Sequence, residues 1–307
     1  MFNFGVDLGG TNISAGIVDK NNNIIFKESV KTGTSQKTDD ILKKIVDLYY
    51  SIINKANINE TLIENVGIGV PGKINYDTFI IEHCPNLFIK NWNIISSLKS
   101  KINKPLYIDN DANCALLAEQ FFIKNKENLT IAMITIGTGI GSSIMIHNKI
   151  LNNCELGHMI INKNGRPCNC GQNGCFETYA SITGLKTTTK EFLKNNPDSL
   201  INKLINYDIN NLSGKTVFEA LKFNDLAAKK ILNTYIDDLS CGISNLINIF
   251  NPDFLIIGGG ISKEINHLIN PIKNHFKKKN IKIIPAKFFN DSGIIGAAAL
   301  ADRPENR

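Results

Sequence analysis

Apolar residues follow two periods along this chain, one typical of helices and one typical of strands. Helical patterns with a period near 3.6 cover residues 39–55, 94–101, 111–124, most of 180–250, and 292–301. Short apolar runs bounded by turn residues cover residues 2–7, 13–18, 24–30, 65–70, 105–109, 129–136, 142–146, 253–257 and 281–285. Strands that alternate with helices over this length predict an α/β fold.

A strand, a glycine-rich turn and a second strand occur twice, at residues 4–18 and again at residues 131–146. The first turn reads Gly-Gly-Thr and the second Gly-Thr-Gly. Glycines allow backbone N–H groups to approach an anion, and a threonine adds a hydroxyl, so both turns are candidate phosphate loops. Either turn alone could be an ordinary β-turn. The repeat favours two halves that each donate a phosphate loop to a cleft between domains.

Two further strand ends carry candidate functional residues. The strand at 105–109 runs into Asn110 and Asp111, which could simply cap the helix that follows. Because the carboxyl ends of strands in α/β folds face the ligand cleft, Asp111 could instead be a general base. Residues 258–260 are three glycines after the strand at 253–257, and they could lie against a ligand or form a plain tight turn.

Residues 155–177 hold the most specific chemical pattern in the chain. Cys168, Cys170 and Cys175 fall within eight residues, and His158 lies ten residues before the first of them. Three thiolates and one imidazole complete a tetrahedral zinc set and leave no position for water, which predicts a structural metal site. The alternative is three buried or incidental thiols. Glutamates at both ends of the stretch would be held in place by such a zinc clasp.

Composition limits the classes of function. The chain has 307 residues, a length that suits about two domains, and 43% of them are hydrophobic, which is enough for a large core. The net charge of +6 is spread over lysines, and the run at 277–279 is typical of a solvated face, so we expect no nucleic-acid partner. We see no signal peptide and no apolar run long enough to span a bilayer, so we expect a cytoplasmic protein with no membrane partner. A reducing compartment also suits cysteines that bind metal.

Five segments in this order resemble the ROK family (repressor, open reading frame, kinase) of sugar kinases, most closely its bacterial glucokinases: Asp7-Leu8-Gly9-Gly10-Thr11, Asn110-Asp111-Ala112-Asn113, Gly137-Thr138-Gly139-Ile140-Gly141, Glu155-Leu156-Gly157-His158, and Cys168-x-Cys170-Gly171-x-x-Gly174-Cys175-x-Glu177. The resemblance covers essentially the whole chain. It implies two actin-like (ribonuclease H-like) α/β domains around a central cleft, with a zinc-binding loop. We expect an N-terminal domain at 1–112, a C-terminal domain at 113–290, and a closing helix at 291–307 that packs back on the first domain.

The resemblance also implies a reaction, the phosphorylation of a hexose by ATP with Mg²⁺, most simply glucose to glucose 6-phosphate, in a homodimer with structural Zn²⁺. Asp111 would be the general base that accepts the proton of the sugar hydroxyl. The sugar would be bound by Asn86, Asn110, Asp111, Glu155, His158 and Glu177. Asp7 would lie near Mg²⁺, and the nucleotide and its phosphates would be bound by Gly10, Thr11, Thr138, Gly139, Gly259 and Gly260. Zinc would be bound by His158, Cys168, Cys170 and Cys175.

The chain departs from the family pattern in two places. The glycine-rich loop that usually precedes the Glu-x-Gly-His segment is shortened to residues 151–154, and Ser142 and Ser143 replace glycines after the second turn. Because the shortened loop lies near the sugar, the sequence does not determine which hexose is the substrate, and N-acetylmannosamine, N-acetylglucosamine and fructose are alternatives to glucose. A sugar-binding protein without turnover is a second alternative. A DNA-binding repressor is disfavoured because the first hairpin begins at Phe2 and leaves no room for a preceding helix-turn-helix.

Overall fold

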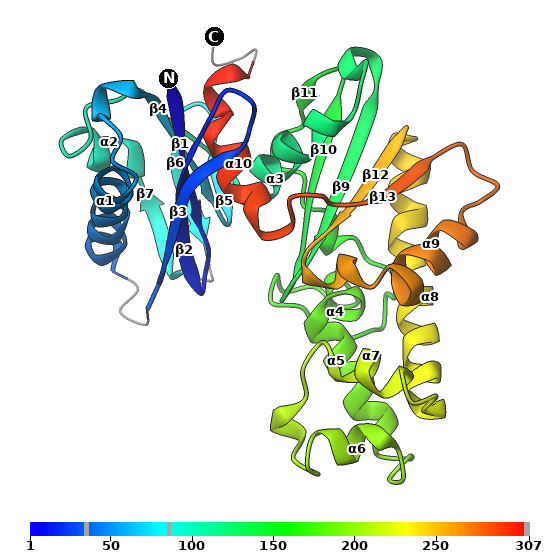
Figure 1. The fold of residues 1–307 in the computed structure, drawn as a ribbon. Coiled ribbons are helices and arrows are strands. Elements are labelled where there is room, and N and C mark those ends of the chain that lie inside the picture. Colours follow the sequence, from blue (N-terminus) through cyan, green and yellow to red (C-terminus); the bar gives the residue numbers. More distant parts are fainter. Residues whose placement is uncertain (34–36, 85–86, 304–307) are drawn as a thin grey trace. The chain divides into compact units, whose positions relative to one another are not determined.

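The structure is a computed structural model that describes residues 1–33, 37–84 and 87–303 (Figure 1). The chain forms two compact units. The first contains residues 1–128, 144–153 and the C-terminal segment from 288 onward. The second contains residues 129–143 and 154–287.

The first unit is built on a mixed five-stranded sheet in the order β3-β2-β1-β4-β8. Its strands are β1 (Phe2–Leu8), β2 (Asn12–Val18), β3 (Ile24–Lys31), β4 (Ile63–Val70) and β8 (Leu106–Asn110). The first three strands form an antiparallel meander, whereas β4 and β8 run parallel to β1. The carboxyl ends of β1, β4 and β8 therefore lie at one edge of the sheet, where Asp7 and Asn110 are found.

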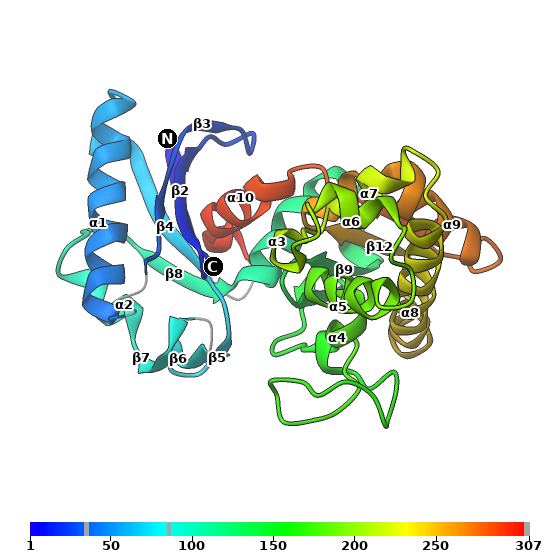
Figure 2. The ribbon, with the colours of Figure 1, turned by 90° about the horizontal axis from the view of Figure 1, so that it is seen from below.

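Helices cover both faces of this sheet (Figure 2). The aromatic ring of Phe4 packs at 4.9 Å against that of Tyr49 in α1 (Thr38–Lys55). Because side chains alternate along a strand, Gly5 faces the other way, toward α10 (Ser292–Ala298). A β-carbon at Gly5 would lie 1.9 Å from the carbonyl oxygen of Ile294, so only glycine allows α10 to come this close. Two further helices complete the unit, α2 (Ile94–Lys99) and α3 (Asp111–Glu119).

Residues 73–93 show no clear helical or strand period in the sequence, so the sequence predicts an irregular segment there. The structure shows that this prediction is wrong. They form a small antiparallel sheet, β5-β6-β7, in the described part of the segment. Its strands are β5 (Lys73–Asn75), β6 (Ile80–Cys84) and β7 (Ile89–Trp92). Strands of three to five residues are too short to show a clear period of two, which explains the miss.

The second unit contains most of a sheet with the equivalent order, β11-β10-β9-β12-β13. Its strands are β9 (Thr130–Ile136), β10 (Ile140–Ile146), β11 (Lys149–Ile150), β12 (Phe254–Gly258) and β13 (Lys282–Pro285), and residues 144–153 are counted with the first unit. Strands β12 and β13 again continue in parallel from the central strand. The two equivalent strand orders confirm the predicted fold class, two actin-like α/β domains.

Helices make up most of the rest of the second unit. They are α4 (Glu177–Ala180), α5 (Ile182–Leu193), α6 (Leu200–Leu204), α7 (Thr216–Leu221), α8 (Leu226–Phe250) and α9 (Asn270–His275). The long helix α8 packs on α4, α5 and α7, and the Tyr235 hydroxyl donates to the Ala180 carbonyl oxygen over 2.6 Å. No helix in the described ranges, α8 included, has both the length and the apolar character that crossing a bilayer requires.

The bounds of the two units differ from the domain bounds expected at residues 112 and 290. Helix α3 belongs to the first unit because it packs against α10, and a β-carbon at Gly296 would lie 1.7 Å from the Cys114 carbonyl oxygen. Helix α10 also packs on β1 and β4. The C-terminal segment and α3 are therefore built into the same core as the N-terminal strands.

Candidate active site

The first glycine turn joins β1 to β2. The Gly9 N–H donates to the Asn12 carbonyl oxygen over 2.9 Å, and the Thr32 hydroxyl from the end of β3 donates to the Gly9 carbonyl oxygen over 2.7 Å. Gly10 and Thr11 are exposed at the tip of the turn. These two bonds fix the base of the turn while Gly10 and Thr11 stay exposed at its tip, as a phosphate loop requires.

Asp7 precedes this turn and is crowded by the start of α10. A β-carbon at Gly293 would lie 2.6 Å from the Asp7 carboxyl carbon, so the helix backbone rests directly on the carboxylate. Burial of the carboxyl group raises the pKa of Asp7 from 3.8 to about 6, because desolvation disfavours the charged form. A cation bound beside Asp7 would reverse this effect, which is consistent with a residue that works near a metal ion.

Asn110 and Asp111 form the junction between β8 and α3. The Asn110 side-chain oxygen accepts the Ala112 N–H over 2.9 Å, so Asn110 is the helix N-cap, and its amide nitrogen donates to the Gly72 carbonyl oxygen over 3.2 Å. One Asp111 carboxylate oxygen also accepts the Ala112 N–H over 2.8 Å. The capping interpretation therefore holds for Asn110, and Asp111 is half-buried in the first helical turn with its carboxylate fixed by the backbone.

Asp109, directly before this junction, is completely buried. One of its oxygens accepts the Asn110 N–H over 2.6 Å, the Tyr76 hydroxyl over 2.7 Å and the Asn113 amide over 2.9 Å. Its other oxygen accepts a hydrogen bond from the guanidinium of Arg303. Sequence patterns alone missed the Tyr76 and Arg303 contacts, because both residues lie far from Asp109 along the chain.

The second glycine turn, residues 137–139, joins β9 to β10 and is anchored to the start of α5. The Thr183 hydroxyl donates to the Thr138 carbonyl oxygen over 2.7 Å. A β-carbon at Gly139 would lie 2.6 Å from a Glu177 carboxylate oxygen, so Glu177 rests against this turn. Gly259 has a φ of +86°, and a β-carbon there would lie 2.1 Å from the Ile136 carbonyl oxygen, so the glycines after β12 lie beside the end of β9.

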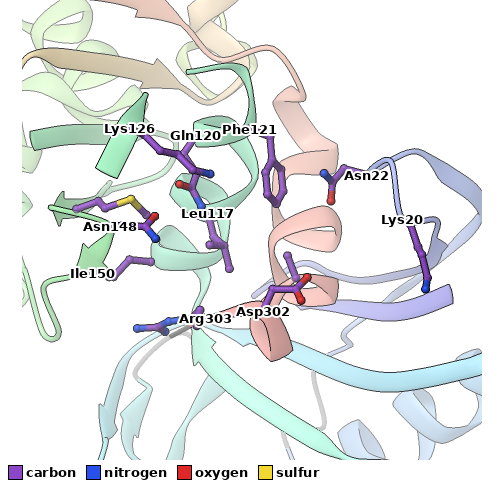
Figure 3. A pocket seen from close by; sticks show the side chains of 12 residues that line it. Lys20, Asn22, Leu117, Gln120, Phe121, Lys126, Asn148, Ile150, Asp302 and Arg303 are labelled. Atoms are coloured by element: carbon purple, nitrogen blue, oxygen red, sulfur yellow. The ribbon is translucent and has the colours of Figure 1, made fainter. Parts of the chain in front are cut away.

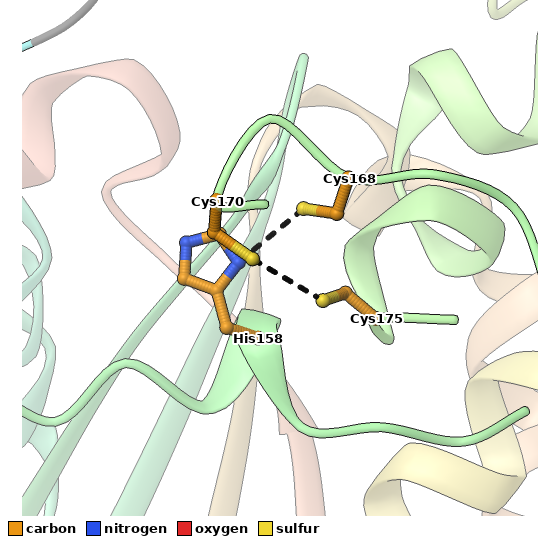
Figure 4. Close-up of side chains that lie close together, drawn as sticks. All are labelled: His158, Cys168, Cys170 and Cys175. Atoms are coloured by element: carbon orange, nitrogen blue, oxygen red, sulfur yellow. Dashed lines mark hydrogen bonds between the residues drawn. The ribbon is translucent and has the colours of Figure 1, made fainter. Parts of the chain in front are cut away.

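The four predicted metal ligands come together (Figure 4). Their ligand atoms all lie within 4.8 Å of one another. The Cys168 Sγ and His158 Nδ1 are 3.6 Å apart, and so are the sulfur atoms of Cys170 and Cys175. A tetrahedral zinc site with bonds of about 2.0–2.3 Å separates its ligand atoms by about 3.4–3.8 Å, so both 3.6 Å separations and the chemistry of the donor set fit zinc.

The pKa values of the three thiols in this cluster are shifted in different directions. Burial raises the pKa of Cys168 and of Cys175, whereas the backbone N–H of Gln172 lowers the pKa of Cys170. Since zinc binds thiolates, two of the three thiols must give up protons that their surroundings favour. Metal affinity should therefore weaken as the pH falls.

Glu177 and Glu155, the two flanking glutamates, are held in different ways. Glu177 lies against the cluster, with a carboxylate oxygen 3.1 Å from the Cys168 sulfur and 3.6 Å from His158 Nδ1. Glu155 is exposed, but the segment around it is fixed by Ser142, whose hydroxyl donates to the Cys154 carbonyl oxygen over 2.7 Å and accepts the Leu156 N–H over 2.8 Å. Ser142 was noted in the sequence only as a replaced glycine, and this bracing role was missed.

Each unit thus gathers its own share of the predicted residues. The first holds Asp7, the first turn and the Asn110–Asp111 junction, and the second holds the metal ligands, both glutamates, the second turn and the glycines after β12. Asn86 lies outside the described residues. A cavity of about 410 Å³ in the first unit, lined by residues such as Gln120, Lys126 and Asn148, contains none of the predicted site residues (Figure 3).

The raised pKa of Asp7 predicts a pH dependence of stability. Below about pH 4 the carboxyl is protonated in both states, and above about pH 6 the folded protein must bury a charge that the unfolded chain exposes to water. The contribution of Asp7 to the free energy of unfolding should therefore fall as the pH rises from about 4 to about 6, by at most about 3 kcal/mol for a pKa shift of about two units. Urea unfolding without Mg²⁺ measures it, and Asp7→Asn should remove this fall; parallel curves for the two proteins would disprove the assignment.

The metal cluster predicts one zinc ion per chain. Cys170→Ser removes one of four ligands and should lower the zinc content measured by elemental analysis. It should also lower the melting temperature, since metal binding contributes to folding. Cys241→Ser is the matched control, because Cys241 is exposed and lies outside the cluster. Equal zinc contents in the two variants would exclude a four-ligand site.

Comparison with known proteins identifies relatives along almost the whole chain. The ROK family pattern matches residues 3–304. A glucokinase from Thermotoga maritima is 31% identical over an alignment of 311 positions that covers 96% of each chain. A xylose repressor from Caldicellulosiruptor bescii is 27% identical and covers 96% of this chain and 77% of the repressor.

A solved structure gives the same result for the fold. The ROK family glucokinase from Streptomyces griseus, in complex with glucose and AMPPNP, is 27% identical and superimposes with a TM-score of 0.85. The match covers 98% of this chain and 99% of that one. The family match spans both glycine turns and the cysteine loop, so the protein belongs to the ROK family.

Proposed function

We propose that this protein is an ATP-dependent hexose kinase that transfers the γ-phosphoryl group of ATP to the 6-hydroxyl of glucose. The observation that carries the proposal is the Asn110–Asp111 junction. It presents an anchored carboxylate at the end of a buried strand, in a chain whose relatives include glucokinases. Phosphoryl transfer depends on positioning and charge stabilisation more than on covalent help from the protein, and the two glycine turns and Asp111 supply groups of these kinds.

In this proposal Asp111 accepts the proton of the attacking hydroxyl. The new bond joins the sugar oxygen to the γ-phosphorus, the bond to the β-phosphate bridging oxygen breaks, and the proton goes to the Asp111 carboxylate. The proton is lost late, when the phosphoryl group resembles metaphosphate, so an ordinary carboxylate is basic enough. The backbone bond from Ala112 holds that carboxylate at the strand end.

Charge on the nucleotide is handled by the two turns and by Asp7. N–H groups of the exposed turn around Gly10 and Thr11, and those of residues 138–139, bind phosphate oxygens. Asp7 is the residue that we place nearest Mg²⁺, which when bound would neutralise negative charge on the phosphates. Gly259 and Gly260 pass under the nucleotide. Within the described part of the chain, no atom outside the immediate chain neighbours lies within 4 Å of a β-carbon built on Gly260, so the space beside Gly260 can take a ligand.

The second unit supplies sugar-binding groups. Glu155 and Glu177 offer carboxylates and His158 offers an imidazole as partners for sugar hydroxyls. Asn110 offers its side-chain amide in the first unit. Because Nδ1 of His158 faces the sulfur atoms, its Nε2 is the nitrogen left for a hydroxyl. Zinc would be held by His158 and the three cysteines, and its role would be structural, to fix the loop that carries Glu177.

Turnover across a panel of sugars tests the proposal. We expect glucose to give the highest kcat/KM in a coupled ATPase assay. Because residues 151–154 are short, we also expect unusual tolerance of changes at the 2-position, as in mannose, N-acetylglucosamine and N-acetylmannosamine, with fructose as a further comparison. Binding of glucose without turnover of any sugar would identify a sugar-binding ROK protein instead.

The role of Asp111 has a direct test. Asp111→Asn should lower kcat by about 10²-fold or more, the scale of a lost general base. Glucose affinity measured by calorimetry should largely survive, since the amide can still hydrogen-bond. Asp198→Asn, an equal change at an exposed position, should leave both quantities unaltered. Near wild-type kcat in Asp111→Asn would show that another group accepts the proton.

A further inference from the structure

Arginine is rare in this chain. It occurs only at positions 166, 303 and 307, although lysine and arginine together number 34. The two arginines that the structure describes are both largely buried, with side-chain exposures of 18% for Arg166 and 6% for Arg303. A guanidinium presents five N–H donors in a planar fork that a lysine ammonium cannot reproduce. In a chain that uses lysine almost everywhere, these two positions indicate a need for guanidinium geometry.

Arg166 lies two residues before Cys168, and its terminal nitrogens have four acceptors. Its Nη1 donates to the carbonyl oxygens of Thr178 and Gly184 over 3.0 and 3.4 Å. Its Nη2 donates to the Thr188 hydroxyl over 2.9 Å and to a Glu191 carboxylate oxygen over 2.6 Å. All four terminal N–H donors are thereby used, so the part of the cysteine loop at Arg166 is fixed to α4 and α5.

Tyr179 completes this arrangement. Its ring lies 4.7 Å from the Arg166 guanidinium carbon, and its hydroxyl accepts the Arg166 backbone N–H over 2.8 Å. Thr178 and Tyr179 directly follow Glu177 in α4, so Arg166 holds the backbone beside the glutamate without using any metal ligand. Glu177 is therefore held twice, by the metal cluster and by this arginine.

Arg303 has the corresponding place in the first unit. Its guanidinium donates to Asp109, whose other oxygen accepts the N–H of Asn110 and the hydroxyl of Tyr76. The ion pair joins residues that are 194 positions apart, and the exposed fraction of each side chain is 6% or less. A buried carboxylate without its cation would be strongly disfavoured, so the position of the Asn110 backbone depends on Arg303.

We propose that Arg166 and Arg303 are positioning residues, one for each part of the site, and that they control different steps. Arg166 orients Glu177 for the sugar, so it should govern sugar affinity. Arg303 orients the strand end that carries Asp111, so it should govern the rate of phosphoryl transfer. The kinetic part of this inference rests on the proposed hexose kinase activity.

Charge-conserving variants test it, because a general loss of stability would not separate kcat from KM. Arg166→Lys should raise the KM for glucose about 10-fold or more, with little change in kcat and with its zinc content retained. Arg303→Lys should lower kcat about 10-fold or more, with little change in the KM for glucose; small misplacements of a reacting group have effects of this size. The proposal would be overturned if Arg166→Lys mainly lowered kcat or if Arg303→Lys mainly raised the KM for glucose.

Milder variants cover the case in which a lysine variant does not fold. Tyr179→Phe and Tyr76→Phe each remove one hydroxyl from one network and leave the arginine in place, and they should reproduce the two opposite patterns at smaller size. Asp225→Asn is the control for stability alone. Asp225 is the N-cap of α8 and accepts hydrogen bonds from the N–H groups of Leu200 in α6 and Ala228 in α8. It belongs to neither arginine network, so this change should lower the melting temperature without affecting kcat and KM differently. If the tyrosine variants behave like Asp225→Asn, the proposal is wrong.

Hydrogen exchange distinguishes failure of this inference from failure of the proposed function. If the wild-type protein phosphorylates no hexose, the proposed function fails, and exchange in the free protein still tests the positioning. Arg166→Lys should then speed exchange selectively at residues 174–180, and Arg303→Lys at residues 108–113. Uniform acceleration in both variants would refute separate positioning roles.

Discussion

The first unit depends on how closely α10 approaches the sheet and α3. The helix backbone contacts the backbone of β1 and β4 at Gly5 and Gly67, where an added β-carbon would lie 1.9 and 1.8 Å from carbonyl oxygens of the helix. Through Gly293 the same helix presses on Asp7, and through Gly296 it meets α3, which begins at Asp111. The close approach of this one helix therefore fixes both the carboxylate beside the first turn and the helix that carries the proposed base.

The second unit holds its functional groups by different means. The cysteine loop has little apolar surface of its own and is closed by polar contacts, such as the Gly174 N–H to the Arg166 carbonyl oxygen over 2.7 Å. Among the apolar side chains of residues 159–177, Cys175 and Phe176 are buried, and Phe176 fills the space that Gly242 leaves on α8. Dispersion and burial stabilise such a loop weakly, so the contacts of Arg166 stabilise it, and a metal ion bound by the cluster would stabilise it further.

The sequence predicted the parts of this protein that depend on neighbours along the chain. The long helices, the two hairpins with their glycine turns and the metal ligands all follow from local spacing, because period and turn chemistry are local properties. The capping role of Asn110 was one of two open interpretations, and the structure shows it. The bracing of Glu155 by Ser142 and the burial of Asp109 against Tyr76 and Arg303 could not be predicted, since hydroxyl and guanidinium contacts over long separations leave no periodic trace. The strands β5, β6 and β7 were missed because each is too short to show a period of two.

The return of the C-terminal helix to the N-terminal sheet has a consequence for biosynthesis. Strands β1 and β4 leave the ribosome early, but the face that bears Gly5 and Gly67 stays uncovered until residues 292–298 have emerged. The second unit consists of residues 129–143 and 154–287, so all of its residues have left the ribosome before α10 is complete. On this order of synthesis, the residues that carry the cysteine cluster are all present before the unit that carries Asp7 and Asp111 can be completed, so a chain truncated before α10 would carry the cysteine cluster without a finished first unit.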